Sequence, residues 1–180
     1  MNANVSKPAV FLDRDGVLVE ERSYITDITD LKIFPYTASC IRILKELGYY
    51  AICISNQSAV GRGMMQLSDL KVINLYLKEH TGIDAIYCCP HYWKENIPAC
   101  DCRKPQTGLF RQAMRDFPID LQDSYMVGDR ATDIMAGQKI GVRTILLESG
   151  YGSARLEVPV TPDYIVQDLR AAVRILSSGR

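Results

Sequence analysis

The chain has 180 residues, 47% of them hydrophobic, and its 21 basic and 21 acidic residues give a formal net charge of zero. This length suits one α/β domain over residues 1–180 and leaves little room for a second domain. The balanced charge gives no indication of nucleic acid or an anionic membrane as a partner. No apolar run has signal-peptide length or approaches the roughly 20 residues that span a bilayer, so a cytoplasmic protein is expected.

Short apolar runs alternate with helical patterns along the chain. Strands are predicted at residues 8–13, 49–55, 83–89, 124–129 and 142–148, and one more strand and helix near the C-terminus. Helices are predicted over residues 37–47, after a cap at Ser68, after a cap at Thr107, and over residues 131–139. This order predicts a doubly wound, Rossmann-like parallel sheet that is covered on both faces.

Three predicted strands end in residues that suit phosphoryl transfer, namely Asp13, Ser55 and Asp129. Ligands of such sheets bind at the carboxyl ends of the strands. Asp13 can attack phosphorus and form an aspartyl-phosphate. Asp15 can protonate the leaving oxygen and later deprotonate the attacking water. The pair therefore indicates a phosphatase.

Charge balance at this site calls for cations. Asp13 and Asp129 would repel one another, and their oxygen ligands suit Mg²⁺. Lys104 and the Ser55 hydroxyl are the natural donors to phosphate oxygens, and Arg103 can form a forked contact with a substrate oxygen. Asp133, one turn after Asp129, either joins this acidic cluster or simply supports the start of a helix.

The segments FLDRDGVL, SNQS, CRKP and VGDRATD resemble, in order, the four motifs of the haloacid dehalogenase superfamily of phosphatases. Within that superfamily the chain is similar to the heptose-bisphosphate phosphatases and to the related histidinol-phosphate phosphatases. The resemblance implies Asp13 as nucleophile, Asp15 as proton donor, and Ser55 and Lys104 as ligands of the phosphoryl group. It also implies Mg²⁺ held by Asp13, the backbone carbonyl of Asp15, and Asp129.

A second cluster lies in the loop over residues 89–102. Cys89-Pro-His91 is followed after eight residues by Cys100-Asp-Cys102. Three thiolates and one imidazole form a common tetrahedral Zn²⁺ set, and four protein ligands leave no open position, which indicates a structural metal. The two phosphatase families carry the same arrangement. Cys88 is left out of the set because alternation along its strand points it away from Cys89.

The substrate is expected to be a small phosphorylated sugar bound in an open site. Residues 17–50 and 56–103 leave no length for a large cap domain of the kind that many superfamily members insert. The residues expected to bind substrate are Glu21, Arg22, Ser23, Tyr24, Asn56, Gln57, Ser58, Arg62, Arg103 and Arg130. SNQSAVGRG, with Arg62, resembles the heptose-bisphosphate form of its loop, and a second phosphate would favour another cation there.

The expected activity is Mg²⁺-dependent hydrolysis of the 7-phosphate of D-glycero-D-manno-heptose 1,7-bisphosphate by a monomer, in the synthesis of nucleotide-activated heptose for a bacterial surface glycan. Two alternatives remain. A histidinol-phosphate phosphatase would use the same chemistry. A non-enzymatic receiver module also uses Asp, Ser or Thr, and Lys, but it accepts phosphate on a later strand and needs no Zn²⁺ loop.

Overall fold

The computed structural model describes residues 6–92, 100–150 and 159–178. Its strands are β1 (Lys7–Leu12), β2 (Tyr50–Asn56), β3 (Ala85–Cys89), β4 (Ile119–Gly128), β5 (Arg143–Leu147) and β6 (Tyr164–Val166). Its helices are α1 (Thr37–Glu46), α2 (Ser58–Gly61), α3 (Leu67–Thr81), α4 (Gly108–Asp116), α5 (Ala131–Ile140) and α6 (Leu169–Ser178), with a 3-10 turn η1 (Ile28–Asp30).

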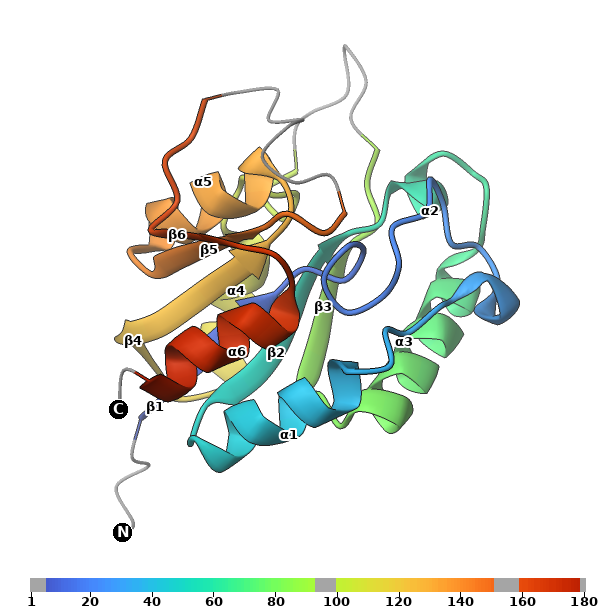
Figure 1. Ribbon diagram of the computed structural model, residues 1–180. Coiled ribbons are helices and arrows are strands. Elements are labelled where there is room, and N and C mark those ends of the chain that lie inside the picture. The colour runs from blue at the N-terminus through green and yellow to red at the C-terminus, as the bar shows by residue number, and fades with distance from the viewer. Residues whose placement is uncertain (1–5, 93–99, 151–158, 179–180) are drawn as a thin grey trace, which may run out of the picture.

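The six strands form one parallel sheet in the order β3-β2-β1-β4-β5-β6. The predicted doubly wound fold is therefore confirmed (Figure 1). The chain first adds strands on one side of β1 and then turns back to add β4, β5 and β6 on the other side. This reversal places the topological switch point between β1 and β4, where sheets of this order bind their ligands.

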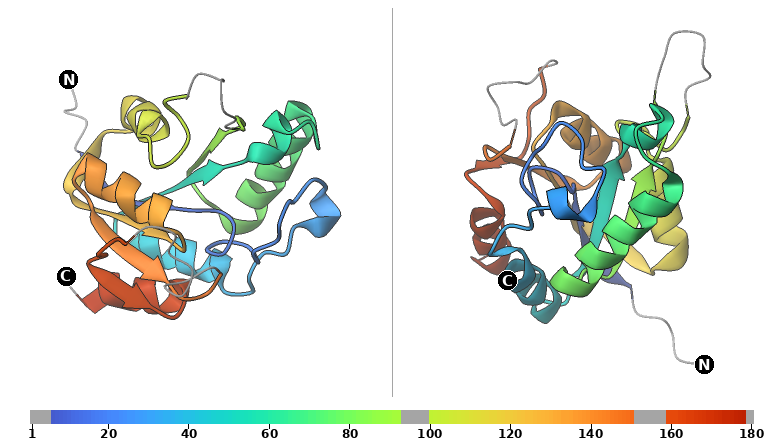
Figure 2. Two further views of the ribbon diagram at one scale, coloured as in Figure 1. Left: turned by 90° about the horizontal axis from the view of Figure 1, so that it is seen from above. Right: turned by 90° about the vertical axis from the view of Figure 1, so that its right-hand side faces the viewer.

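Helices cover both faces of the sheet (Figures 1 and 2). Helices α1, α3 and α6 bury their apolar sides on one face, against strand residues such as Val10 and Leu12. Helices α4 and α5 cover the other face, against Ala9 and Phe11. Because successive strand residues point to opposite faces, the continuous apolar run of β1 supplies both cores.

Strand β4 is longer than predicted, since it begins at Ile119 rather than Ser124. Its first half contains partly and fully exposed polar residues, so the apolar run alone does not mark its start. The register with β1 shifts between Pro8 and Val10, and the Ala9 amide donates to the Ser124 hydroxyl at 2.8 Å. Pro8 has no amide hydrogen for the ladder, which is consistent with an irregularity at this point.

Two helix starts differ from the predicted caps. The cap at Ser68 is wrong: Gln66 is the N-cap, α3 begins at Leu67, and the Asp69 carboxylate accepts from the Gln66 amide at 2.9 Å. Thr107 precedes α4 as predicted, but its hydroxyl makes no capping bond and instead accepts from the Arg111 guanidinium. In both places the side chain that pairs lies within one turn of the helix start, but the bond it makes is not the hydroxyl-to-amide bond that the sequence suggested.

Residues 13–36, between β1 and α1, contain only η1 as regular structure, so no large cap is inserted there. The loops of this stretch lie over the carboxyl ends of the strands. Within the described residues, no helix is both long and apolar enough to cross a bilayer.

Candidate active site

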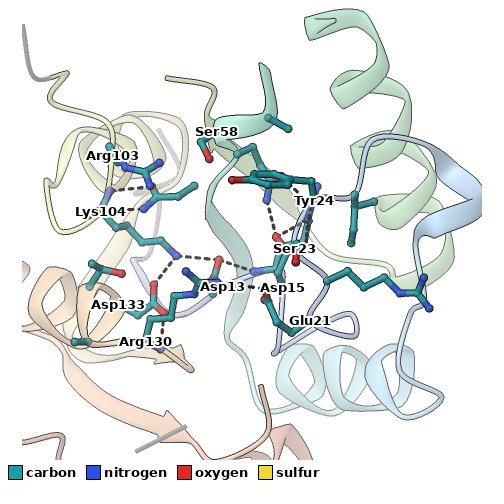
Figure 3. A pocket seen from close by; sticks show the side chains of 18 of the residues that line it. Asp13, Asp15, Glu21, Ser23, Tyr24, Ser58, Arg103, Lys104, Arg130 and Asp133 are labelled. Carbon is teal, nitrogen blue, oxygen red and sulfur yellow. Dashed lines mark hydrogen bonds and ion pairs between the residues drawn. The ribbon is translucent and has the colours of Figure 1, made fainter. Parts of the chain in front are cut away.

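Lys104 lies at the centre of a buried ionic cluster beyond the ends of β1, β2 and β4. Its ammonium contacts Asp13 Oδ1 at 2.9 Å and Asp133 Oδ1 at 2.6 Å, and it donates to the Ile54 carbonyl at 2.5 Å (Figure 3). Burial alone would lower the pKa of Lys104, but the two carboxylates outweigh it and raise that pKa above its ordinary value. The side chain is therefore a fixed cation at the switch point.

The two carboxylate oxygens of Asp13 differ in their partners. Oδ1 accepts from both the Lys104 ammonium and the Arg14 amide, the latter at 2.7 Å. Among the described residues no donor contacts Oδ2 of Asp13. This division leaves one oxygen for attack on an electrophile while the other is held by the protein.

Asp13, Asp129 and Asp133 each place a carboxylate oxygen within 4.8 Å of the others. All three are buried. A Cβ added at Gly16 would lie 2.3 Å from Asp129 Oδ2, and one added at Gly150 would lie 2.2 Å from the same atom. The Asp129 carboxylate thus occupies a cradle that only two glycines permit. Three hard oxygen donors around one point fit a divalent cation such as Mg²⁺.

Asp133 was assigned no role in catalysis from the sequence, and the structure gives it two contacts. Its Oδ2 accepts from the Arg130 amide at 3.1 Å at the start of α5, and its Oδ1 pairs with Lys104. Burial, the largest effect, raises the pKa of Asp133 to about 6, against the opposing effect of Lys104. Both interpretations that the sequence left open, helix start and acidic cluster, apply to this residue.

Asp15 faces away from Lys104, toward Arg14 and Gln57. Arg14 Nε lies 3.2 Å from both Asp15 oxygens, and Gln57 Nε2 donates to Asp15 Oδ2 at 2.7 Å. The same Gln57 nitrogen donates to the Ser55 hydroxyl oxygen at 2.8 Å. Because Ser55 accepts this bond, its own hydrogen is available for another acceptor. Sequence reasoning missed Arg14, since an arginine between two acids carries no pattern that separates it from a solvated one.

The amide of Asn56 holds the backbone of Lys104. Its Oδ1 accepts from the Lys104 amide at 2.9 Å and its Nδ2 donates to the Lys104 carbonyl at 3.1 Å. Asn56 and Gln57 were both predicted to bind substrate. Both line the cavity, but their amide groups are engaged by other side chains or backbone of the protein.

A cavity of about 920 Å³ opens onto this cluster. Its lining contains thirteen residues that the sequence placed in the site, which are Asp13, Asp15, Glu21, Arg22, Ser23, Tyr24, Asn56, Gln57, Ser58, Arg62, Arg103, Lys104 and Arg130. Ser55 and Asp129 are buried and are not among the lining residues. These lining residues come from four parts of the chain. They meet beside the strand ends, as the sequence predicted.

Several arginines line this cavity. The guanidinium of Arg62 lies 3.6 Å from the centre of the Tyr92 ring and 5.6 Å from that of Tyr24. Arg130 pairs with Glu21 at 3.2 Å, and Arg103 donates to the His91 carbonyl at 3.4 Å. These cations are therefore held by the protein before any anion binds.

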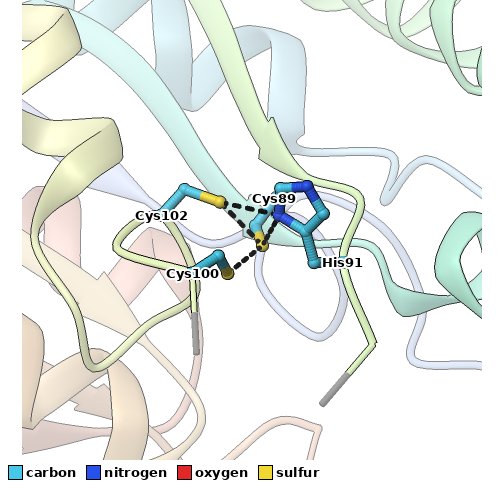
Figure 4. Close-up of side chains that lie close together, drawn as sticks. All are labelled: Cys89, His91, Cys100 and Cys102. Atoms are coloured by element: carbon cyan, nitrogen blue, oxygen red, sulfur yellow. Dashed lines mark hydrogen bonds between the residues drawn. The ribbon is translucent and has the colours of Figure 1, made fainter. Parts of the chain in front are cut away.

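The predicted zinc ligands lie close together, Cys89 and His91 at the end of β3 and Cys100 and Cys102 on the returning segment (Figure 4). Their four ligand atoms, from Cys89, His91, Cys100 and Cys102, all lie within 4.8 Å of one another. Cys89 Sγ lies 3.1 Å from Cys102 Sγ and 3.5 Å from Cys100 Sγ. This donor set fits Zn²⁺. Residues 93–99 of the loop lie outside the described residues.

Cys88 lies apart from this cluster, as predicted. Its sulfur accepts from the Asn74 side chain on the opposite face of β3. Cys40 and Cys53 are buried in the core, away from the cluster.

Helix α2 packs directly on the cysteine loop. The Gln57 amide donates to the Cys89 carbonyl at 2.7 Å, and the Gly61 amide donates to the Pro90 carbonyl at 2.8 Å. A Cβ at Gly61 would lie 2.4 Å from the Tyr92 nitrogen. The loop therefore supports two flanks of the cavity, one that carries Lys104 and one that carries Arg62.

Comparison with known proteins agrees with this geometry. The HAD-hydrolase-like family model matches residues 101–172. A D-glycero-β-D-manno-heptose-1,7-bisphosphate 7-phosphatase from Haemophilus ducreyi is 37% identical over 81% of this chain and 86% of its own length. A D-glycero-D-manno-heptose-1,7-bisphosphate 7-phosphatase from Thermosynechococcus vestitus is 38% identical over 93% of this chain and 94% of its own.

A solved structure shows the same fold. The D,D-heptose 1,7-bisphosphate phosphatase from B. bronchiseptica, complexed with magnesium and phosphate, superposes with a TM-score of 0.83 at 27% identity, over 96% of this chain and 99% of that one. With the parallel sheet, the acidic cluster at its switch point and these relatives, the chain belongs to the heptose-1,7-bisphosphate 7-phosphatase family of haloacid dehalogenase-like hydrolases.

Proposed function

We propose that this protein hydrolyses the 7-phosphate ester of D-glycero-D-manno-heptose 1,7-bisphosphate. The observation that carries the proposal is the placement of Asp13, which lines the cavity with its Oδ1 fixed by Lys104 and the Arg14 backbone amide. Relatives of that name match the chain over most of its length. A receiver module is not favoured, because the acidic nucleophile lies after the first strand and beside Asp15.

The reaction runs in two steps on side chains of this site. A carboxylate oxygen of Asp13 attacks phosphorus, the ester P–O bond breaks, and the departing sugar oxygen takes a proton from Asp15. Water then attacks phosphorus of the aspartyl-phosphate and gives a proton to Asp15, which releases inorganic phosphate and restores Asp13. Lys104 and the Ser55 hydroxyl stabilise the charge on the phosphoryl oxygens.

Asp13, Asp129 and the backbone carbonyl of Asp15 would hold Mg²⁺. The three buried carboxylates around one point support this assignment, because a single lysine does not balance them. When bound, the cation supplies charge neutralisation at the transferring phosphoryl group. Asp133 holds the Lys104 ammonium beside Asp13 and contributes a further oxygen to the same cluster.

Zn²⁺ would be held by the three cysteines and His91 as a structural metal. The convergence of the four ligand atoms supports this role, and Cys102 lies two residues before Lys104 in the chain. The metal would fix the segment that delivers Arg103 and Lys104 to the cavity.

The second phosphate of a bisphosphate would be bound by the arginines that line the cavity. Arg62 and Arg103 flank the side of the cavity that borders the cysteine loop, and Arg22 and Arg130 line it with them. Histidinol phosphate carries one phosphate and a cationic amine. The arginines that line the cavity would repel that amine. The charge of these arginines therefore favours the heptose bisphosphate over that alternative.

Phosphate release from heptose 1,7-bisphosphate, as both anomers, and from histidinol phosphate tests the proposal, with Mg²⁺ present and under matched conditions. The proposal predicts a strong preference for the heptose bisphosphate, and Arg62→Gln should reduce kcat/KM for it about 10- to 100-fold. Preference for histidinol phosphate would contradict the substrate assignment, and no release from either would contradict the activity.

A further inference from the structure

Arg14 is buried beneath the cavity. Among the described residues it is the largest fully buried side chain, with 1% of its surface exposed. Its Nε lies 3.2 Å from each Asp15 oxygen and its Nη2 lies 3.0 Å from Asp15 Oδ1. The third nitrogen, Nη1, makes no hydrogen bond with the described part of the chain. The guanidinium is therefore directed mainly at the carboxylate of Asp15, and its Nη2 is shared with the side chain of Gln57.

Gln57 completes the surroundings of that carboxylate. Its Oε1 accepts from Arg14 Nη2 at 2.8 Å, and its Nε2 donates to Asp15 Oδ2 at 2.7 Å. Only 5% of Gln57 is exposed, and its backbone amide is anchored on the Cys89 carbonyl at 2.7 Å. Arg14, Asp15 and Gln57 thus form a closed triangle in which each side chain contacts the other two.

Stability alone does not explain this triangle. Burying an arginine with its partner carboxylate removes both charges from water, and such pairs are weak sources of stability. The contacts instead fix the geometry of Asp15. Its carboxylate lies at the edge of the cavity with 18% of the side chain exposed, and it is held at both oxygens. A group that transfers protons benefits from such fixing, because the reaction depends on its distance and direction.

We propose that Arg14 and Gln57 are positioning residues that hold Asp15 for proton transfer. The inference rests on the proposed function, in which Asp15 gives a proton to the departing sugar oxygen and later takes one from water. Neither positioning residue needs to touch the substrate. Their effect should therefore depend on whether the leaving group requires a proton.

Two leaving groups separate this role from a general structural one. The alkoxide of a sugar is a poor leaving group and needs the proton of Asp15 as the ester bond breaks. The 4-nitrophenolate ion leaves readily without one. Loss of Asp15 positioning should slow release of the sugar far more than release of 4-nitrophenolate, whereas damage to Lys104, Ser55 or the fold would slow both.

The experiment measures kcat/KM for heptose 1,7-bisphosphate and for 4-nitrophenyl phosphate in the wild type, Gln57→Met, Arg14→Met and Asp15→Asn. Methionine keeps the length of the glutamine side chain and removes its amide. Gln57→Met should lose about 10-fold more activity on the sugar than on the aryl ester, in the direction shown by Asp15→Asn. In the double variant with Asp15→Asn, this selective loss should disappear, because the residue acts through Asp15.

Gln138→Met serves as the matched control, since the Gln138 side-chain amide also donates one hydrogen bond, to the Thr161 carbonyl, but is exposed on α5. It should leave both rates unchanged. Gln57→Met also removes the bond to the Ser55 hydroxyl, which should slow both substrates alike. Losses that are equal on both substrates, or a selective loss that persists without Asp15, would therefore overturn the inference while the proposed function stands. If Asp15→Asn itself shows no leaving-group selectivity, the acid role of Asp15 fails and the inference falls with it. Should Arg14→Met not fold, Gln57→Met still decides.

Discussion

Asn56 fixes the backbone of Lys104 through both atoms of its side-chain amide, at 2.9 and 3.1 Å. The two residues lie 48 positions apart in the chain, and this contact ties the end of β2 to the segment that follows the cysteine loop. Lys104 reaches Asp13 and Asp133 only if its backbone stays in place. The amide is therefore as important to the geometry of the site as the charged groups that it supports.

Asn56→Ala should remove both hydrogen bonds and leave a partly buried amide and carbonyl of Lys104 unsatisfied. The expected cost is about 1–3 kcal/mol of unfolding free energy. The kcat should fall by more than this loss of stability explains, because Lys104 loses its position. Denaturant unfolding and steady-state kinetics check this expectation. Gln138→Ala, which removes one exposed amide contact remote from the cavity, should change neither quantity appreciably.

Lys104→Met should leave Asp13 and Asp133 facing one another without the cation between them. Loss of this fixed charge at the transferring group is expected to lower kcat about 100- to 1000-fold. Lys104→Arg should not restore it, because a planar forked guanidinium cannot replace a point charge held at 2.6 and 2.9 Å from two carboxylates. Rate measurements with saturating Mg²⁺ test this, and near-wild-type turnover by the arginine variant would contradict the described role.

Gly150→Ala should weaken Mg²⁺ binding, because the added Cβ would lie 2.2 Å from Asp129 Oδ2 and displace that carboxylate. The readout is the rise in thermal stability on titration with Mg²⁺, which needs no substrate. Gly141→Ala is a matched control, since Gly141 has the same φ of 80° and no atom within 4 Å of an added Cβ. It should cost at least about 1 kcal/mol of stability and leave Mg²⁺ affinity intact. Equal Mg²⁺ responses in the two variants would argue against the glycine cradle.

The strand ends that carry Asp13, Ser55 and Asp129 could be predicted from the sequence because each follows an apolar run, and parallel strands bring such ends to one edge. The direction of the polar side chains could not. Asn56 and Gln57 stand next to Ser55 and were expected to face substrate, yet their amides bind Lys104 and Asp15. Those partners come from other strands and loops, and no local pattern records which donor meets which acceptor.

Chelation of Zn²⁺, or Cys100→Ser, should reduce activity by disturbing both flanks of the cavity. Arg103 follows Cys102 directly, while Arg62 lies on the turn that binds the Pro90 carbonyl through Gly61. The KM for the bisphosphate should therefore rise more than the KM for 4-nitrophenyl phosphate, which has no second phosphate to bind. Kinetics with metal content measured in the same samples provide the check. Cys40→Ser, which changes a buried thiol outside the cluster, should keep the metal and both KM values. Full activity in a zinc-free protein would contradict the supporting role of the loop.

The most direct test of the account is ³¹P NMR of heptose 1,7-bisphosphate incubated with Mg²⁺ and either the wild type or Asp13→Asn. The account predicts that the wild type releases inorganic phosphate from C7 and leaves the 1-phosphate in place, while the variant, which retains Lys104 and the arginines but lacks the nucleophilic oxygen, releases none above background. Release of the 1-phosphate by the wild type, or turnover that survives in Asp13→Asn, would contradict it.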